Sequence, residues 1–292
     1  MKKRTFYLVL AIVVLIIIAV IAYRAINQKE TYTFKVDKFS YTHRGKAKYT
    51  ETFLNKTGNI SVYSVTFPSR NFLTYPITIY GLLFIPTGKK GGVVLLPGGG
   101  VSKEAESRLA NILAEKGYAV LTIDQRGIGE TGGYYLGFDD DYRVFLKGDE
   151  PIQHLSVYDA LRAYDVLKEI YGKDEIAMMG ESMGGRYAMI AGAVEKRLKG
   201  VLVISSSGFH FDNSNPYLLS IDPDHYVSDI APRPLVMLHG DNDSTVKIDD
   251  AKITYSLARQ PKSFFIAPGC RHGYCGKMKE TMLDGLKEIL GE

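Results

Sequence analysis

Short apolar runs alternate with segments of helical periodicity along most of this 292-residue chain. The apolar runs lie at residues 92–96, 118–123, 175–179, 201–205, 235–238 and 263–266. Residues 103–116, 152–171, 184–194, 248–259 and 276–290 repeat apolar side chains at helical spacing. Fully apolar strands between helices are typical of a parallel sheet covered on both faces. We therefore predict an α/β fold with a mostly parallel central sheet, preceded by antiparallel strands at 61–68 and 77–85.

An uncharged apolar run occupies residues 5–23 and follows three basic residues at positions 2–4. As a helix it would be roughly 28 Å long, which is close to the thickness of a bilayer's hydrocarbon core. The positive-inside rule then places the N-terminus in the cytoplasm and the rest of the chain outside. A cleaved signal peptide has a shorter apolar core, and a buried core helix would rarely lack a polar face. A single-pass membrane anchor is the expectation, with these two alternatives left open.

The chain is accordingly divided into four parts. These are a cytoplasmic N-terminus (1–4), a transmembrane signal-anchor helix (5–23), a juxtamembrane segment with early strands (24–60) and a catalytic domain (61–292). The remaining length, about 265 residues, is enough for one large domain and marginal for two. The net charge is only +4 without a basic block, so nucleic acid is not an expected partner.

The motif Gly180-Glu181-Ser182-Met183-Gly184 lies between an expected strand and an expected helix. A Gly-x-Ser-x-Gly sequence at a strand-to-helix turn is typical of a nucleophile elbow. Side chains at the two glycine positions would collide with the neighbouring strand and helix in so tight a turn. The motif predicts Ser182 as a nucleophile, the alternative being a glycine-rich turn with a surface serine.

A serine nucleophile needs a base and a group that orients the base. Asp241 and Asp243 follow the strand at 235–238, and His272 follows the strand at 263–266. Ser182 and these residues therefore lie just beyond strand ends, where open parallel sheets assemble their sites. The order Ser, Asp, His is the chain order of one known hydrolase fold.

These motifs resemble the α/β-hydrolase superfamily over roughly residues 61–291, nearest to its esterase, dienelactone-hydrolase and prolyl-oligopeptidase-like branches. In those branches the acid follows a His-Gly-x-x-Asp-x-x-Val pattern. The pattern occurs here as His239, Gly240, Asp243 and Val246. The resemblance thus implies that Asp243 rather than Asp241 is the triad acid, that His272 is the base and that His239 is structural.

The resemblance also implies an oxyanion hole made of backbone N–H groups. One donor is expected to be Met183, directly after the nucleophile. The other is expected in the loop 97–100, with Gly99 preferred and Gly98 second. Relatives often have His-Gly at the start of this loop, and Pro97-Gly98 departs from that pattern. The loop at 124–131 matches a further family motif that is mainly structural.

Cys270 and Cys275 bracket His272. They are compatible with a disulfide that braces the loop in an oxidising compartment, or with two thiols. A metal site with His272 would consume the base and would supply only three visible ligands, so no metal or other cofactor is expected. Residues 207–233, where many relatives insert a large cap, allow only a small one.

The resemblance implies acyl transfer to water through an acyl-enzyme, most simply by a membrane-anchored carboxylesterase. A prolyl-oligopeptidase-like serine peptidase is the alternative, although about 40 residues after the anchor cannot supply that group's propeller domain. From a different class, the alternative is a non-catalytic binding protein on a hydrolase scaffold. The expected partners are a small-molecule ester or short peptide substrate, and the membrane through the N-terminal helix.

Overall fold

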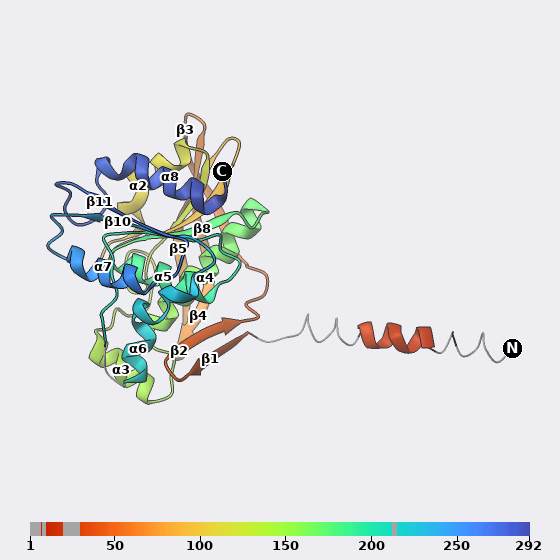
Figure 1. Ribbon diagram of the computed structural model, residues 1–292. Helices are drawn as coiled ribbons and strands as arrows, with labels where there is room; N and C mark the ends of the chain where they lie inside the picture. Colours follow the sequence, from red (N-terminus) through yellow and green to blue (C-terminus); the bar gives the residue numbers. More distant parts are fainter. Residues whose placement is uncertain (1–6, 8–9, 20–29, 212–214) are drawn as a thin grey trace.

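The computed structural model describes residues 7, 10–19, 30–211 and 215–292 (Figure 1). Within them, nine strands form one sheet in the order β11-β10-β9-β8-β6-β7-β5-β4-β3. The strands are β3 (Thr50–Thr57), β4 (Ile60–Phe72), β5 (Tyr75–Pro86), β6 (Gly91–Leu96), β7 (Tyr118–Ile123), β8 (Ile176–Glu181), β9 (Val201–Ile204), β10 (Leu235–Gly240) and β11 (Lys262–Ala267). The six strands β11-β10-β9-β8-β6-β7 are parallel to their neighbours. The remaining pairs, β7 with β5, β5 with β4 and β4 with β3, are antiparallel.

Helices cover both faces of the sheet. The helices α2 (Ser107–Glu115) and α8 (Lys279–Leu290) pack on one face, and α4 (Ile152–Tyr171), α5 (Met183–Val194) and α7 (Ile248–Leu257) on the other (Figure 1). Each face has its own buried apolar cluster, because side chains of β6, β7, β8, β9 and β10 alternate between the two. This arrangement confirms the predicted α/β fold with a mostly parallel sheet.

The sheet extends further toward the N-terminus than residue 61, where the catalytic domain was predicted to begin. Strand β3 pairs with β4 along its whole length, although every one of its residues is exposed. An edge strand that is exposed on all sides carries no apolar alternation, so the sequence offered little sign of it.

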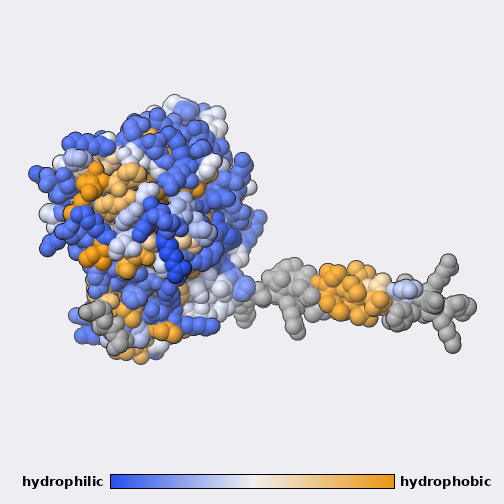
Figure 2. All heavy atoms as spheres, in the orientation of Figure 1, coloured by the Kyte–Doolittle hydropathy of each residue, from blue (hydrophilic) through white to orange (hydrophobic). Residues whose placement is uncertain are grey.

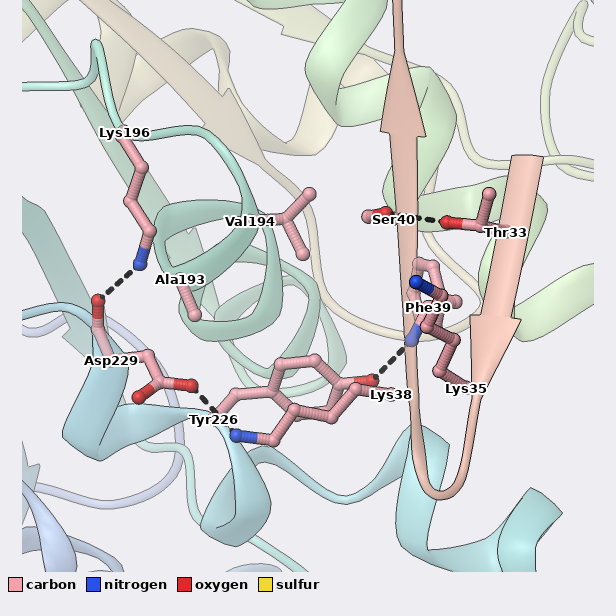
Figure 3. A pocket seen from close by; sticks show the side chains of 10 residues that line it. All are labelled: Thr33, Lys35, Lys38, Phe39, Ser40, Ala193, Val194, Lys196, Tyr226 and Asp229. Atoms are coloured by element: carbon pink, nitrogen blue, oxygen red, sulfur yellow. Dashed lines mark hydrogen bonds and ion pairs between the residues drawn. The ribbon is translucent and has the colours of Figure 1, made fainter. Parts of the chain in front are cut away.

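The predicted juxtamembrane stretch also contains a hairpin, made of β1 (Thr31–Lys35) and β2 (Lys38–Thr42). The ring of Phe39 stacks on that of His154 in α4, with 3.9 Å between the centroids. The Phe39 N–H donates to the Tyr226 hydroxyl at 3.3 Å, and Lys38 pairs with Asp229 (Figure 3). The hairpin is therefore part of the folded domain.

The chain is also held at the start of the hairpin. Glu30 accepts hydrogen bonds from Arg70 in β4, at 2.6 Å, and from the Tyr158 hydroxyl in α4, at 2.8 Å. These contacts tie residue 30 to both the sheet and a helix that covers it.

Two helical segments lie outside these layers. The stretch 132–151 contains α3 (Phe138–Leu146), and the predicted small cap contains α6 (Pro216–Ile221) and the single 3-10 turns η2 (Pro223–His225) and η3 (Val227–Asp229). The Tyr217 hydroxyl of α6 donates to Asp141 of α3 at 2.9 Å. The two segments therefore pack together, on the lower side of the view in Figure 1.

Part of the apolar N-terminal run is described. Tyr7 and residues 10–19 are helical, and their apolar side chains are exposed (Figure 2). The rest of the predicted anchor at 5–23 and the predicted cytoplasmic residues 1–4 lie outside the described residues. Across the part of the chain that the structure describes, no helix combines the length and hydrophobicity needed to cross a membrane.

Candidate active site

Ser182 occupies a sharp turn between β8 and α5. Its backbone has φ 50° and ψ −117°, a left-handed conformation that costs a non-glycine residue on the order of 1–3 kcal/mol. The Ser182 N–H donates to the carbonyl of Ile204 at 2.9 Å, and the Ser206 hydroxyl donates to the Ser182 carbonyl at 2.8 Å. The surrounding backbone therefore holds the strained residue in place.

The two glycines of the motif are required by close backbone contacts. A Cβ atom on Gly180 would lie 2.3 Å from the carbonyl oxygen of Gly184. A Cβ atom on Gly184 would lie 2.3 Å from the carbonyl oxygen of Leu96 in β6. A larger residue at position 180 would collide with the start of α5, and one at position 184 would collide with the end of β6. The predicted elbow geometry is therefore present.

Asp243 lies in the loop after β10 and holds the ring of His272. The carboxylate is fully buried, and its Oδ2 atom lies 2.8 Å from Nδ1 of His272. The N–H groups of Thr245 and Val246 each donate to Oδ1 at 2.9 Å. Burial opposes ionisation, but these hydrogen bonds hold the pKa of Asp243 below its ordinary value. With Asp243 ionised, Nδ1 of His272 is the donor and Nε2 is left as the acceptor.

The other candidates near this pair have structural contacts. Asp241 accepts the Gly269 N–H at 2.6 Å and so joins the loops that follow β10 and β11. His239 is buried, and its Nε2 atom lies 2.8 Å from the carbonyl of Val246. The structure thus places Asp243, and neither Asp241 nor His239, against His272 in the orienting position.

A cavity of about 450 Å³ brings four of the five predicted site residues together. It is lined by Gly98, Gly99, Val101, Ala105, Glu106, Glu181, Ser182, Met183, Thr245, His272 and Gly273. Asp243 lies behind His272. No hydrogen bond joins the side chains of Ser182 and His272 in the described part of the chain. Such contacts often tighten only when substrate binds.

The loop 97–100 lies over the first turn of α5. A Cβ atom on Gly99 would be 3.4 Å from Cε of Met183, and one on Gly98 would be 3.7 Å from Cβ of Ser182. The Gln125 side chain donates to the Pro97 carbonyl at 2.7 Å and holds the loop there. Met183 is the first residue of α5, where backbone N–H groups have no partner within the helix. The arrangement suits the binding of a negative charge beside Ser182.

The loop that carries His272 is braced at several points. Cys270 and Cys275 form a disulfide that brackets the histidine, so neither sulfur is free to bind a metal. The Gly273 N–H donates to the Ser205 hydroxyl at 3.0 Å, and the Tyr274 N–H donates to Glu181 at 3.1 Å. His272 is thus held by contacts of its loop with Glu181 of β8 and with Ser205 after β9, as well as by Asp243.

Two carboxyl groups in the cavity wall were not predicted as site residues. Glu181 precedes Ser182, and Glu106 ends the 3-10 turn η1 (Lys103–Glu106). Burial, and then the nearby Glu181, raise the pKa of Glu106 to about 8. Burial also raises the pKa of Glu181, although the hydrogen bond from the Tyr274 N–H and the nearby His272 act to lower it. The position of Glu181 inside the motif was visible in the sequence, whereas nothing marked Glu106 as buried.

Parts of this chain are similar to known proteins, several of them hydrolases. A family model described as "Serine aminopeptidase, S33" matches residues 87–222. The uncharacterized protein YfhR of Escherichia coli is 25% identical over 171 residues, which cover 56% of this chain and 56% of YfhR. The chain thus spans about half the length of that relative. The 2,6-dihydropseudooxynicotine hydrolase of Paenarthrobacter nicotinovorans is 28% identical over 134 residues, which cover 46% of this chain and 32% of that enzyme.

Solved structures share the whole architecture. Acetyl xylan esterase 1 from Thermoanaerobacterium superposes with a TM-score of 0.69 at 15% identity, covering 84% of this chain and 89% of the esterase. At that identity the likeness concerns the fold. Together with the sheet order and the turn at Ser182, these matches show that the chain has the α/β-hydrolase fold.

Proposed function

We propose that this protein is a serine hydrolase, and most specifically a carboxylesterase, with Ser182 as nucleophile, His272 as base and Asp243 as the orienting acid. One observation carries the proposal. Buried Asp243 holds Nδ1 of His272 at 2.8 Å beside the cavity that His272 shares with Ser182. A hydroxyl, an imidazole and a carboxylate in this arrangement are what acyl transfer requires.

In the proposed reaction, Nε2 of His272 takes the hydroxyl proton as Oγ of Ser182 attacks the substrate's carbonyl carbon. The carbonyl oxygen gains the negative charge and accepts hydrogen bonds from the N–H groups of Met183 and Gly99. His272 then gives its proton to the leaving group, which departs and leaves an acyl-enzyme. Water, deprotonated by His272, attacks the acyl carbon, and Ser182 regains its proton as the acid is released.

A serine peptidase is the second candidate, because the matching family model is described as a serine aminopeptidase. Esters and amides follow the same steps but differ in the leaving group. A panel of p-nitrophenyl esters and aminoacyl nitroanilides separates the two. Higher kcat/KM on the esters supports the esterase, and higher kcat/KM on the anilides supports the peptidase.

Covalent labelling with a fluorophosphonate probe tests the proposed nucleophile. We expect the wild-type protein and Ser256→Ala, which changes an exposed serine, to be labelled and Ser182→Ala to remain unlabelled. Asp243→Asn should lower kcat/KM by about ten-thousand-fold, because the wrong tautomer of His272 is then favoured. Asp241→Asn is the matched control and should stay within a few-fold of wild type. Labelling of Ser182→Ala would overturn the assignment.

We also propose that the run at 5–23 anchors the protein in a membrane as a single span, with the hydrolase domain on the extracytoplasmic side. Its length, the three basic residues before it and the exposed apolar side chains of residues 10–18 support this proposal. The Cys270–Cys275 disulfide is in keeping with an oxidising compartment. Retention in membranes after alkaline extraction is the expected result, and release into the supernatant would contradict it.

A further inference from the structure

The cavity beside Ser182 contains two carboxyl groups that the proposed mechanism does not use. Glu106 is only 4% exposed and lines the cavity from η1. No hydrogen bond or ion pair reaches its carboxyl group among the described residues. Glu181 lines the same cavity from β8 and accepts one hydrogen bond, from the Tyr274 N–H. A buried, unpartnered carboxyl group is therefore directed toward the space where a substrate would bind.

The negative charge of this pair is not balanced by the protein. Among the described residues that line the cavity, His272 is the one basic side chain. Lys103, three residues before Glu106, is turned away and pairs with Asp124 at 3.0 Å and Glu130 at 2.7 Å. Burying a carboxylate without a partner is costly, and burial raises the pKa of both carboxyl groups.

Once the two groups are ionised, such a pair is unfavourable for the hydrolysis of a neutral ester. The reaction develops a negative charge on the carbonyl oxygen, close to the N–H groups of Met183 and Gly99. Ionised carboxylates in the wall of the same cavity oppose that charge. A positive group on the substrate would pair with the carboxylates and remove this opposition, while also filling the hydrogen-bonding capacity of Glu106.

We propose that this site selects esters or amides that carry a positively charged group close to the reacting carbonyl, held by Glu106 and Glu181. The proposal rests on the proposed function and specifies its substrate class. Binding of the cation favours the ionised form of the two carboxyl groups, and a proton released from either of them passes to solvent. Glu106 is then a specificity-determining residue, and Glu181 has a second role in holding the loop of His272.

Two matched substrate pairs test the proposal with the full-length protein. One pair places the charge on the leaving group: acetylthiocholine and its carbon isostere, in which tert-butyl replaces trimethylammonium. The other places it on the acyl group: the p-nitrophenyl esters of aminocaproic acid and heptanoic acid. We expect kcat/KM to be about ten-fold or more higher for the charged member of at least one pair.

In the variants, the measured quantity is the ratio of kcat/KM for the charged substrate to kcat/KM for its neutral counterpart. Glu106→Gln should bring this ratio down to about one, and Glu181→Gln should lower it as well. Glu104→Gln is the matched control, because this exposed carboxylate of the same turn pairs with Lys103 outside the cavity. Its ratio should equal that of the wild type. Fluorophosphonate labelling of each variant verifies that the elbow is folded.

The outcomes separate the two proposals. Labelling of Ser182 with no preference in either pair, or a preference that survives Glu106→Gln, overturns the substrate class and leaves the hydrolase assignment standing. Absence of both labelling and hydrolysis in the wild-type protein overturns both.

Discussion

Two buried carboxyl groups near Ser182 have pKa values that shift in opposite directions. Asp243 accepts hydrogen bonds from Thr245, Val246 and His272, and its pKa is lowered although burial opposes this. Glu106 is buried beside another carboxyl group and accepts no such hydrogen bonds within the described part of the chain. Its pKa is raised to about 8. Donors rather than depth of burial therefore decide which group is ionised at neutral pH.

Glu106 should make the folded state less stable as the pH rises. Its pKa in the folded state, about 8, lies above its ordinary value of 4.5, so folding favours the protonated form. Stability that is present below pH 4.5 is lost progressively as the pH rises toward 8, by an amount on the order of a few kcal/mol. Glutamine at this position does not titrate, and Glu106→Gln removes this loss.

Thermal unfolding of Glu106→Gln and wild type across this pH range measures the effect. The gain in Tm from the substitution should be larger at alkaline than at acidic pH. The control Glu104→Gln should show no such trend, because that side chain is exposed. A Tm difference for Glu106→Gln that stays constant with pH would contradict the prediction.

For individual residues, the Gly-x-Ser-x-Gly motif and the chain order of Ser, Asp and His predicted which side chains lie close together. Ser182, Met183, Gly99 and His272 line one cavity, and Asp243 lies against His272, because all five follow the carboxyl ends of neighbouring strands. Glu106 was not predictable in the same way. A carboxylate in a helical stretch is usually solvated, and only the packing of η1 against β5, β6 and β7 shows that this one is not.

Among the elements, the segment after β2 is held by a buried group of charges. Arg44 donates to Asp165 of α4 at 2.7 Å and also pairs with Glu195, which follows α5. Arg162 donates to the Arg44 carbonyl at 2.9 Å. The side chains of Arg44, Asp165 and Glu195 are all at least nine-tenths buried. This group attaches the hairpin segment to α4 and to the end of α5.

Replacing Arg44 with alanine should be strongly destabilising. The buried carboxylates of Asp165 and Glu195 would lose the positive charge of Arg44, and breaking a buried ion pair typically costs about 3–5 kcal/mol. The matched control is Lys46→Ala, since Lys46 is 81% exposed and pairs with Glu169 at 3.6 Å. That change should stay within about 0.5 kcal/mol. Urea unfolding measures both, and similar midpoints for the two variants would count against the role given to Arg44.

The elements themselves were predictable to different degrees. Strands such as β6, β7 and β10 are buried throughout, so their apolar runs were clear in the sequence. Helix α4 was predicted with its exact limits because its apolar periodicity is long. Strand β3 and helix α3 were not assigned, since the former is exposed along its length and only one residue of the latter is buried.

For the whole molecule, the folded unit includes the chain from residue 30 onward. The hairpin buries Phe39 and Tyr41 against α4, and Glu30 is bonded to Arg70 and Tyr158. The hydrolase fold therefore includes chain that precedes the central sheet. The sequence could not show this, because the hairpin's partners lie more than a hundred residues away, in α4 and beyond α6.

Two deletions test where the folded unit begins. Removal of residues 1–29 should leave the midpoint of urea unfolding and esterase activity close to those of the full chain. Removal of residues 1–48 should lower stability by several kcal/mol, because it strips buried aromatic side chains and Arg44 from α4. Equal midpoints for the two shortened proteins would show that the hairpin is dispensable.

The contacts of Glu30 also determine how the domain would respond to mechanical load. Among the described contacts, a pulling force applied ahead of residue 30 first loads the ion pair of Glu30 with Arg70 and its hydrogen bond from Tyr158. The next resistance is the hairpin, whose strands are bonded only to each other in the described sheets. Under tension the hairpin would peel from α4 before any force reached β8 and the elbow. If the proposed anchor holds the chain ahead of residue 30, load on that attachment would be taken by the hairpin and would not reach the turn at Ser182.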